Sequence, residues 1–280
     1  MFEYIIGLLG LLLAYRGAYF FLIKRRIKGP APIMVGAEPF FIRRPGKKVA
    51  LMIHGFTSSP KEFRRMGNTL ARQGISVCAP LLPGHGTSPE RLSIVKYNQW
   101  LEFIEEQIKM LEKDYDSIYL VGNSFGGNLA LLSHNCSKKI KGIITLATPI
   151  YFQKERLLRY ILVPIFKRIK LFQKKSKSVR TFLKERSAVA YESVPLRSIA
   201  QLQKTIRLTK KQLSEITAPL LIMQVANDTV VSNKSSQYIH THVASKNVSI
   251  YTVPDSYHVF IMDKHATVAN KQVATFIKSL

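Results

Sequence analysis

The sequence predicts one α/β domain with a mostly parallel central sheet flanked by helices, preceded by an apolar N-terminal segment. Short β-branched runs alternate with helix-like stretches, a pattern typical of parallel strands joined by crossover helices. The 280 residues suit one large domain, and 46% hydrophobic with 21% charged residues allows a packed core. No internal repeat or low-complexity tract interrupts this pattern.

Residues 1–28 predict a membrane anchor. Tyr4–Ile23 is apolar apart from Arg16 and is followed at once by Lys24–Arg26. About 20 apolar residues in a helix match the thickness of a hydrocarbon core. A cleaved signal peptide is the main alternative, but it would carry positive charge before the apolar run, where only Glu3 stands. The basic flank on the C-terminal side predicts that the rest of the chain lies in the cytoplasm.

Residues 29–280 are expected to form the catalytic domain. Gly29–Pro45 is rich in Pro and Gly and predicts a linker. Strands are expected at Val49–Ile53, Ile75–Ala79, Ser117–Val121, Gly142–Leu146, Leu220–Val225 and Val248–Val253. Helices are expected at Lys61–Gln73, Trp100–Asp114, Gly126–His134, Asn233–His242 and Ala266–Leu280. The long interval between Leu146 and Leu220 breaks this alternation and predicts an inserted helical cap at about residues 149–215.

The charge balance is strongly basic, with 42 Lys and Arg against 17 Asp and Glu, a net charge of +25. Such a field attracts an anionic phospholipid surface or nucleic acid, although a general basic bias that aids solubility is the simpler alternative. Basic and apolar residues interleave in Leu157–Ser187, as expected of a lid on an anionic bilayer or of an ordinary cap helix. Without a base-stacking or helix-turn-helix signature, no nucleic-acid partner is expected.

Cysteine and histidine usage favours neither a disulfide scaffold nor a metal site. Cys78 and Cys136 are the two cysteines, and the histidines are dispersed. We therefore expect reduced thiols, no metal and no cofactor.

The strongest chemical signal is the pentapeptide Gly122–Gly126, which reads GNSFG. It lies between a buried-strand pattern and the small-residue start of a helix, the context that a Gly-x-Ser-x-Gly nucleophile turn requires. The glycines avoid clashes between the neighbouring strand and helix, and the helix N-terminus favours developing negative charge. Ser124 is therefore the candidate nucleophile.

A serine hydroxyl needs a base, and the base needs an orienting acid. His258 lies in a loop after the last expected strand, whereas His134, His240 and His242 fall on expected helices and His265 opens the last helix. Asp228 follows the preceding strand and gives the chain order serine, acid, histidine. Asp255 and Asp263 lie closer to His258 in sequence and remain alternatives as the acid, or as a helix cap or hydrogen-bonding neighbour.

Two backbone N–H groups must face the tetrahedral oxygen. One is expected from Phe125, the residue after the nucleophile. The other is expected from Phe56, in the loop after an early strand, and His54 in the same loop is expected to bond loop backbone.

The chain resembles the bacterial carboxylesterase and monoacylglycerol lipase group of the α/β-hydrolase fold. The matching pieces cover about residues 47–280, in the order of the group: LMIHGFTSSP, APLLPGHGTSPE, YNQWLEF, VGNSFGG, YESVPLRSIAQL, ITAPLLIMQVANDTVV and SYHVFIMD. The resemblance implies a triad of Ser124, Asp228 and His258, with Phe56 and Phe125 at the oxyanion hole. Asn227 stands where the group often has an acid. The basic insertion and the anchor also depart from the soluble esterases of the group.

We therefore expect a serine carboxylic ester hydrolase that needs no cofactor and acts on monoacylglycerol-like or other medium-chain acyl esters. The same triad also permits acyl transfer to a second alcohol. The remaining alternative is not an enzyme: a non-catalytic module at the membrane surface that uses the fold as a scaffold.

Overall fold

The computed structural model describes residues 2–153 and 171–280, and its centre is a seven-stranded sheet of order β1-β3-β2-β4-β5-β8-β9. All neighbouring strands pair in parallel except β1, which is antiparallel to β3. The strands are β1 (Phe40–Ile42), β2 (Lys48–Ile53), β3 (Ser76–Ala79), β4 (Ser117–Asn123), β5 (Ile140–Leu146), β8 (Leu220–Val225) and β9 (Val248–Val253). The six strands expected from the sequence are confirmed, with end shifts of up to two residues.

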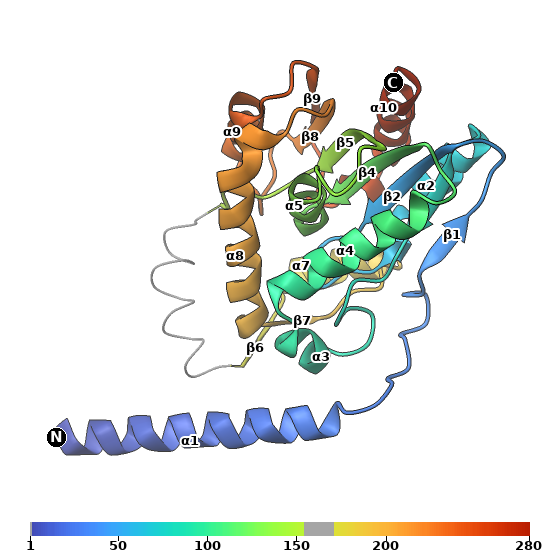
Figure 1. Cartoon of the computed structure of the whole chain (residues 1–280). Helices are drawn as coiled ribbons and strands as arrows, with labels where there is room; N and C mark the ends of the chain where they lie inside the picture. The colour runs from blue at the N-terminus through green and yellow to red at the C-terminus, as the bar shows by residue number, and fades with distance from the viewer. Residues whose placement is uncertain (1, 154–170) are drawn as a thin grey trace.

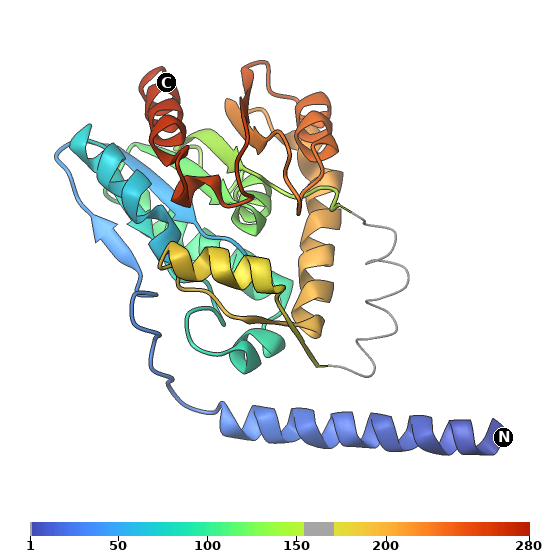
Figure 2. The same ribbon diagram turned by 180° about the vertical axis from the view of Figure 1, so that it is seen from behind.

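Helices cover both faces of this sheet (Figures 1 and 2). One face carries α4 (Tyr97–Leu111), α5 (Phe125–Leu132), α8 (Leu196–Gln212) and α9 (Lys234–His242), and its core includes Trp100, Leu129 and Ile206. The other face carries α2 (Arg64–Arg72) and α10 (Ala266–Lys278). Short elements complete the domain: α3 (Pro89–Ile94) and the 3-10 turns η1 (Pro60–Phe63), η3 (Leu213–Glu215) and η4 (Phe260–Met262).

The strand β1 corrects the linker interpretation of Gly29–Pro45. Phe40 pairs with Ala79 and Ile42 with Val77, so three residues of that segment extend the sheet at its edge. Phe40 is buried, and its ring packs against Gly67 of α2, where a larger residue would crowd it. A three-residue strand next to Pro and Gly gives too short an alternation to be recognised in the sequence.

The insertion contains a small sheet as well as helices. β6 (Phe172–Lys174) and β7 (Ser193–Pro195) form an antiparallel pair, and α7 (Lys177–Glu185) lies between them in sequence. The long helix α8 packs along α5, where the Asn128 side-chain amide donates to Thr209 Oγ1 at 3.3 Å. Of the basic and apolar stretch Leu157–Ser187, the part from residue 157 to residue 170 lies outside the described residues.

The N-terminal helix α1 (Phe2–Arg26) lies apart from the sheet and its flanking helices in both views (Figures 1 and 2). Its 25 residues extend over about 37 Å. The span Glu3–Arg25 is long and apolar enough to cross a membrane, a property that signal sequences share. At its C-terminal end, the Arg197 guanidinium lies 3.8 Å from the Phe20 ring centroid, and Ile23 is buried.

Candidate active site

Ser124 occupies the sharp turn between β4 and α5. Its backbone has φ 50° and ψ −117°, a strained conformation for a residue with a Cβ. Ser124 N donates to Leu146 O at 2.7 Å, which ties the turn to the end of the neighbouring strand β5. The turn therefore holds the hydroxyl out at the carboxyl edge of the sheet.

The glycines around Ser124 are required because neighbouring backbone or side-chain atoms lie where a side chain would begin. A Cβ on Gly122 would overlap the backbone of Gly126, and a Cβ on Gly126 would overlap Ile53 O of β2. A Cβ on Gly127 would meet the Thr148 side chain. At both glycine positions of the pentapeptide, tight packing thus excludes a side chain.

Ser124, His258 and Asp228 form a continuous hydrogen-bonded chain, although they come from three loops. Ser124 Oγ lies 2.9 Å from His258 Nε2, and His258 Nδ1 lies 2.7 Å from Asp228 Oδ2. With Nδ1–H donating to the carboxylate, Nε2 is free to accept the serine proton. The loops after β4, β8 and β9 meet because the carboxyl ends of parallel strands share one edge of the sheet.

The Asp228 carboxylate is buried and held by backbone donors. Its Oδ1 accepts the N–H groups of Val230 at 2.8 Å and Val231 at 3.0 Å. Burial alone would raise the pKa of Asp228, but the hydrogen bond and charge of His258 together with the two backbone donors lower it below its usual value. Asp228 is therefore ionised at neutral pH and acts as a fixed partner for the imidazole.

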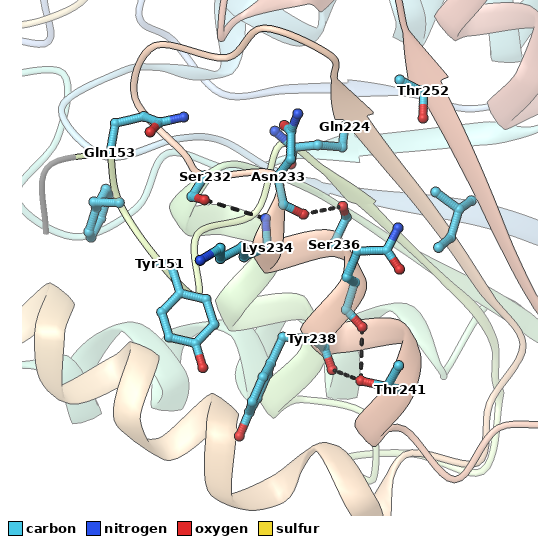
Figure 3. A pocket seen from close by; sticks show the side chains of 13 residues that line it. Tyr151, Gln153, Gln224, Ser232, Asn233, Lys234, Ser236, Tyr238, Thr241 and Thr252 are labelled. Atoms are coloured by element: carbon cyan, nitrogen blue, oxygen red, sulfur yellow. Dashed lines mark hydrogen bonds between the residues drawn. The ribbon is translucent and has the colours of Figure 1, made fainter.

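A second cavity is lined by residues of β8, β9, α9 and the loop after β5 (Figure 3), and three of these residues hydrogen-bond to the Asp228 loop. Gln224, on its wall, donates to Asp228 Oδ2 at 3.3 Å, and Gln153 donates to Asp228 O at 3.0 Å. The side chain of Asn233 donates to Ala226 O. The end of β8, the residue that caps α9 and the loop after β5 thus brace the Asp228 loop. Sequence reasoning missed these supporting residues, because amide side chains in loops carry no distinctive pattern.

The two other acids near His258 have different partners. Asp255 is exposed and pairs with Lys264 at 3.1 Å. Asp263 accepts hydrogen bonds from the Ser256 hydroxyl, from Tyr257 N at 3.4 Å and from His265 N at 2.8 Å. Asp263 is thus a hydrogen-bonding neighbour that braces the His258 loop, whereas Asp228 contacts the imidazole.

The loops expected to form the oxyanion hole are packed together by aromatic rings. Phe125 begins α5, so its N–H is among those without an acceptor inside the helix. The Phe56 and Phe125 rings lie 5.7 Å apart, and both lie against Trp100. His54 Nδ1–H donates to Gly55 O at 3.0 Å, and its Nε2 accepts Leu82 N at 3.1 Å; burial lowers its pKa to about 4. His54 is thus a neutral structural residue, as expected.

A buried carboxyl group, unnoticed in the sequence, joins these two loops. Glu62 Oε1 accepts Gly55 N at 2.8 Å and the side-chain amide of Asn123 at 2.9 Å, and its Oε2 accepts the Ser58 hydroxyl at 2.5 Å. Burial raises the pKa of Glu62, although the three hydrogen bonds partly offset that effect. A lone glutamate in a sequence is expected on a solvated surface, and only the fold places this one in the core.

The site opens into a cavity of about 830 Å³. Ser124, His258 and Phe56 line its floor, and residues of α7 and β7 line the cap side. The ring centroid of Phe182 in α7 lies 4.5 Å from that of Tyr257, the residue before His258, so this contact holds the cap against the His258 loop. The apolar wall consists of Phe152, Val179, Phe182, Leu183, Val194 and Leu202. Within residues 2–153 and 171–280, no group of three or more His, Cys, Asp or Glu residues lies close enough to hold a metal ion.

A strained serine at a strand–helix turn, in line with a histidine and a buried aspartate on this sheet, defines a serine hydrolase of the α/β-hydrolase fold. The chain belongs to the family described as serine aminopeptidase, S33, whose model matches residues 44–265. This membership makes it an enzyme, and the non-catalytic alternative is set aside.

Known relatives agree with the resemblance drawn from the sequence. A thermostable monoacylglycerol lipase from Bacillus sp. (strain H-257) is 29% identical over 83% of this chain and 90% of its own length. A carboxylesterase from Bacillus subtilis (strain 168) is 26% identical over 88% of this chain and 98% of its own length. Among solved structures, one from work on the metagenome-derived lipolytic enzymes LipS and LipT superposes with a TM-score of 0.79 at 23% identity, covering 89% of this chain and all of the other. The chain is thus a carboxylesterase- and monoacylglycerol lipase-like α/β-hydrolase.

Proposed function

We propose that the protein hydrolyses carboxylic esters through an acyl-enzyme intermediate, with Ser124 as nucleophile, His258 as base and Asp228 as the orienting acid. The observation that carries this proposal is the chain of hydrogen bonds from Ser124 Oγ through His258 to Asp228, at 2.9 Å and 2.7 Å. The 2.9 Å distance between Ser124 Oγ and His258 Nε2 allows proton transfer to the imidazole, and the 2.7 Å hydrogen bond to Asp228 orients the ring and stabilises its charged form.

In the first half of the reaction, Ser124 Oγ attacks the ester carbonyl carbon while His258 Nε2 takes its proton. His258 then returns that proton to the leaving alkoxide oxygen as the carbonyl–alkoxide bond breaks. In the second half, a water molecule loses a proton to His258 and attacks the acyl carbon. The acid leaves, and Ser124 regains its proton. The buried charge of Asp228 stabilises the imidazolium that forms in each half.

The developing oxyanion requires two donors, and we assign them to Phe56 N–H and Phe125 N–H. The aromatic contact of 5.7 Å between these two residues supports the assignment, because it fixes the two loops relative to each other. Removing one such donor costs about 10²- to 10³-fold in kcat in serine hydrolases.

The substrate class we propose is a monoacylglycerol-like or other medium-chain acyl ester. The apolar wall of the cavity supports this class, because burying each methylene of an acyl chain there makes the binding free energy more favourable by about 0.8 kcal/mol. The relatives named as a monoacylglycerol lipase and a carboxylesterase support it as well. Acyl transfer to a second alcohol uses the same triad and differs only in what attacks the acyl-enzyme.

We also propose that residues 1–28 anchor the protein in a membrane, with the catalytic domain (residues 29–280) on the cytoplasmic side. The apolar span Glu3–Arg25 and the basic flank after it support this arrangement. The insertion at about residues 149–215 would then serve as a lid whose exposed basic residues, Lys174, Lys177 and Lys184 in its described part, lie near anionic lipid.

A substrate panel tests the function. Purified protein is assayed on p-nitrophenyl esters of increasing chain length, on monoacylglycerols and on aminoacyl p-nitroanilides, each with and without an added acceptor alcohol. We expect rapid hydrolysis of the esters, little cleavage of the anilides and little acyl transfer. Faster cleavage of anilides than of esters would contradict ester hydrolysis, and an acylated alcohol as main product would establish the transferase alternative.

A further inference from the structure

The cavity beside Ser124 contains three described cations, and two of them have partners. Lys264 pairs with Asp255 at 3.1 Å. Arg186 pairs with Glu185 at 3.2 Å, and its guanidinium lies 4.4 Å from the ring centroid of Phe182. The third cation, Lys175, stands at the start of the cap helix region and lines the same cavity as Ser124.

The Lys175 ammonium has no salt bridge or side-chain hydrogen bond within residues 2–153 and 171–280. Its backbone N–H donates to Glu192 O at 2.8 Å, which holds the residue at the end of the β6–β7 hairpin. Its neighbour Lys174 is exposed, whereas Lys175 is half-buried on the cavity side. Burial lowers the pKa of Lys175 to about 8, an effect that the negative charge of Glu62 opposes, so the ammonium form predominates at neutral pH.

Glu62 is not a full counter-ion for this lysine. Its two carboxyl oxygens already accept three hydrogen bonds, from Gly55, Asn123 and Ser58. A partly buried ammonium without a direct partner is costly, and an anionic group of a ligand would relieve that cost.

We propose that Lys175 binds an anionic phosphate on the alcohol part of the substrate, so that the preferred substrates are monoacyl glycerophosphates, the lysophospholipid class. This inference rests on the proposed ester hydrolysis and narrows its substrate. The acyl chain lies along the apolar wall formed by residues such as Val179, Leu183 and Leu202. The phosphate oxygens accept the ammonium N–H groups, a recognised role of lysine. The net charge of +25 attracts such a substrate towards the protein.

The reaction balances as a hydrolysis. Ser124 Oγ bonds to the acyl carbon, the bond from that carbon to the glycerol oxygen breaks, and His258 passes the serine proton to that oxygen. Water then replaces Ser124 on the acyl carbon. The products are a fatty acid and a glycerophosphate, and the phosphate bonds stay intact.

The test compares two short, water-soluble substrates, 1-hexanoylglycerol and 1-hexanoylglycerol 3-phosphate, with the full chain in neutral detergent. Short chains keep the substrates monomeric, so attraction of the protein to an anionic surface does not contribute. We expect wild type to favour the phosphate ester in kcat/KM, and Lys175→Gln to lower that preference about tenfold, mainly through KM. Lys174→Gln is the matched control: it removes one charge from the adjacent exposed position and should leave the preference unchanged.

Product inhibition gives a second measurement that needs no variant. Glycerol 3-phosphate should inhibit wild-type hydrolysis of 1-hexanoylglycerol competitively, and glycerol at the same concentration should not. Wild type that prefers the neutral ester, or a preference lowered equally by Lys174→Gln and Lys175→Gln, would overturn the phosphate site and leave ester hydrolysis standing. Absence of hydrolysis of both esters would overturn the proposed function itself.

Discussion

The side-chain amide of Asn123 donates a 2.9 Å hydrogen bond to Glu62 Oε1, and the same oxygen accepts the N–H of Gly55 at 2.8 Å. Asn123 immediately precedes Ser124, the proposed nucleophile, and Gly55 immediately precedes Phe56. One buried carboxyl group therefore connects the nucleophile turn with the loop assigned to the oxyanion hole. We infer that Glu62 is a positioning residue, acting through these two loops.

Replacing Glu62 by Ala should lower kcat for ester hydrolysis about ten- to a hundredfold, because both loops lose a shared acceptor and their relative placement loosens. KM should change much less. Glu62→Gln keeps an acceptor oxygen and the side-chain shape, so it should recover most of the lost kcat. Steady-state kinetics on a p-nitrophenyl ester, with circular dichroism to check folding, measures both. Equal kcat losses for the two variants would contradict this positioning role.

The raised pKa of Glu62 gives a pH dependence of folding stability with a defined sign. Burial makes the folded state hold the proton more tightly than the unfolded state. The stability of wild type relative to Glu62→Gln should therefore be greatest below the ordinary pKa of a glutamate and should fall as pH rises through the folded pKa. Urea unfolding of both proteins between about pH 4 and about pH 8 measures this difference. A difference that grows with pH would show that folding lowers the pKa of Glu62, and would contradict the raised pKa.

The three residues of the proposed triad could be singled out in the sequence because each is tied to a pattern, and the structure brings their side chains into hydrogen-bond contact. Ser124 lies in a Gly-x-Ser-x-Gly turn, and Asp228 and His258 follow strands whose order in the chain is fixed by the fold. Glu62 could not be predicted, because its role depends on contacts with Asn123, 61 residues away. The same holds for the strand β1, which exists only because β3 offers it an edge.

Asp228→Asn should lower kcat about 10³- to 10⁴-fold, because the amide favours the wrong histidine tautomer. Asp255→Asn should have a small effect, since Asp255 is exposed and pairs with Lys264. Asp263→Asn should cost an intermediate amount by loosening the His258 loop. Comparison of kcat/KM for the three variants on one soluble ester decides the assignment. If Asp255→Asn were the most damaging, Asp228 would lose its role as the acid, while Ser124 and His258 would keep theirs.

A form that lacks residues 1–28 should be soluble and active on short esters, because the triad and its loops make their contacts within the remaining domain. It should still bind anionic vesicles through the basic cap, whose described part includes the exposed residues Lys174, Lys177 and Lys184. Each well-placed basic residue contributes about 1 kcal/mol at an anionic surface, and high salt should weaken the binding by screening. Vesicle co-sedimentation at low and high salt measures this. Equal binding to neutral and anionic vesicles, or to neither, would contradict a membrane-facing lid.

The central claim is that Ser124 is the nucleophile, activated by His258 at 2.9 Å. A fluorophosphonate probe reacts with an activated serine, and mass spectrometry of the digested protein locates the adduct. We predict one adduct, on Ser124, no labelling of the folded Ser124→Ala variant, and ester hydrolysis reduced to a small residual in that variant. An adduct on another residue, or near-normal hydrolysis by folded Ser124→Ala, would contradict the account.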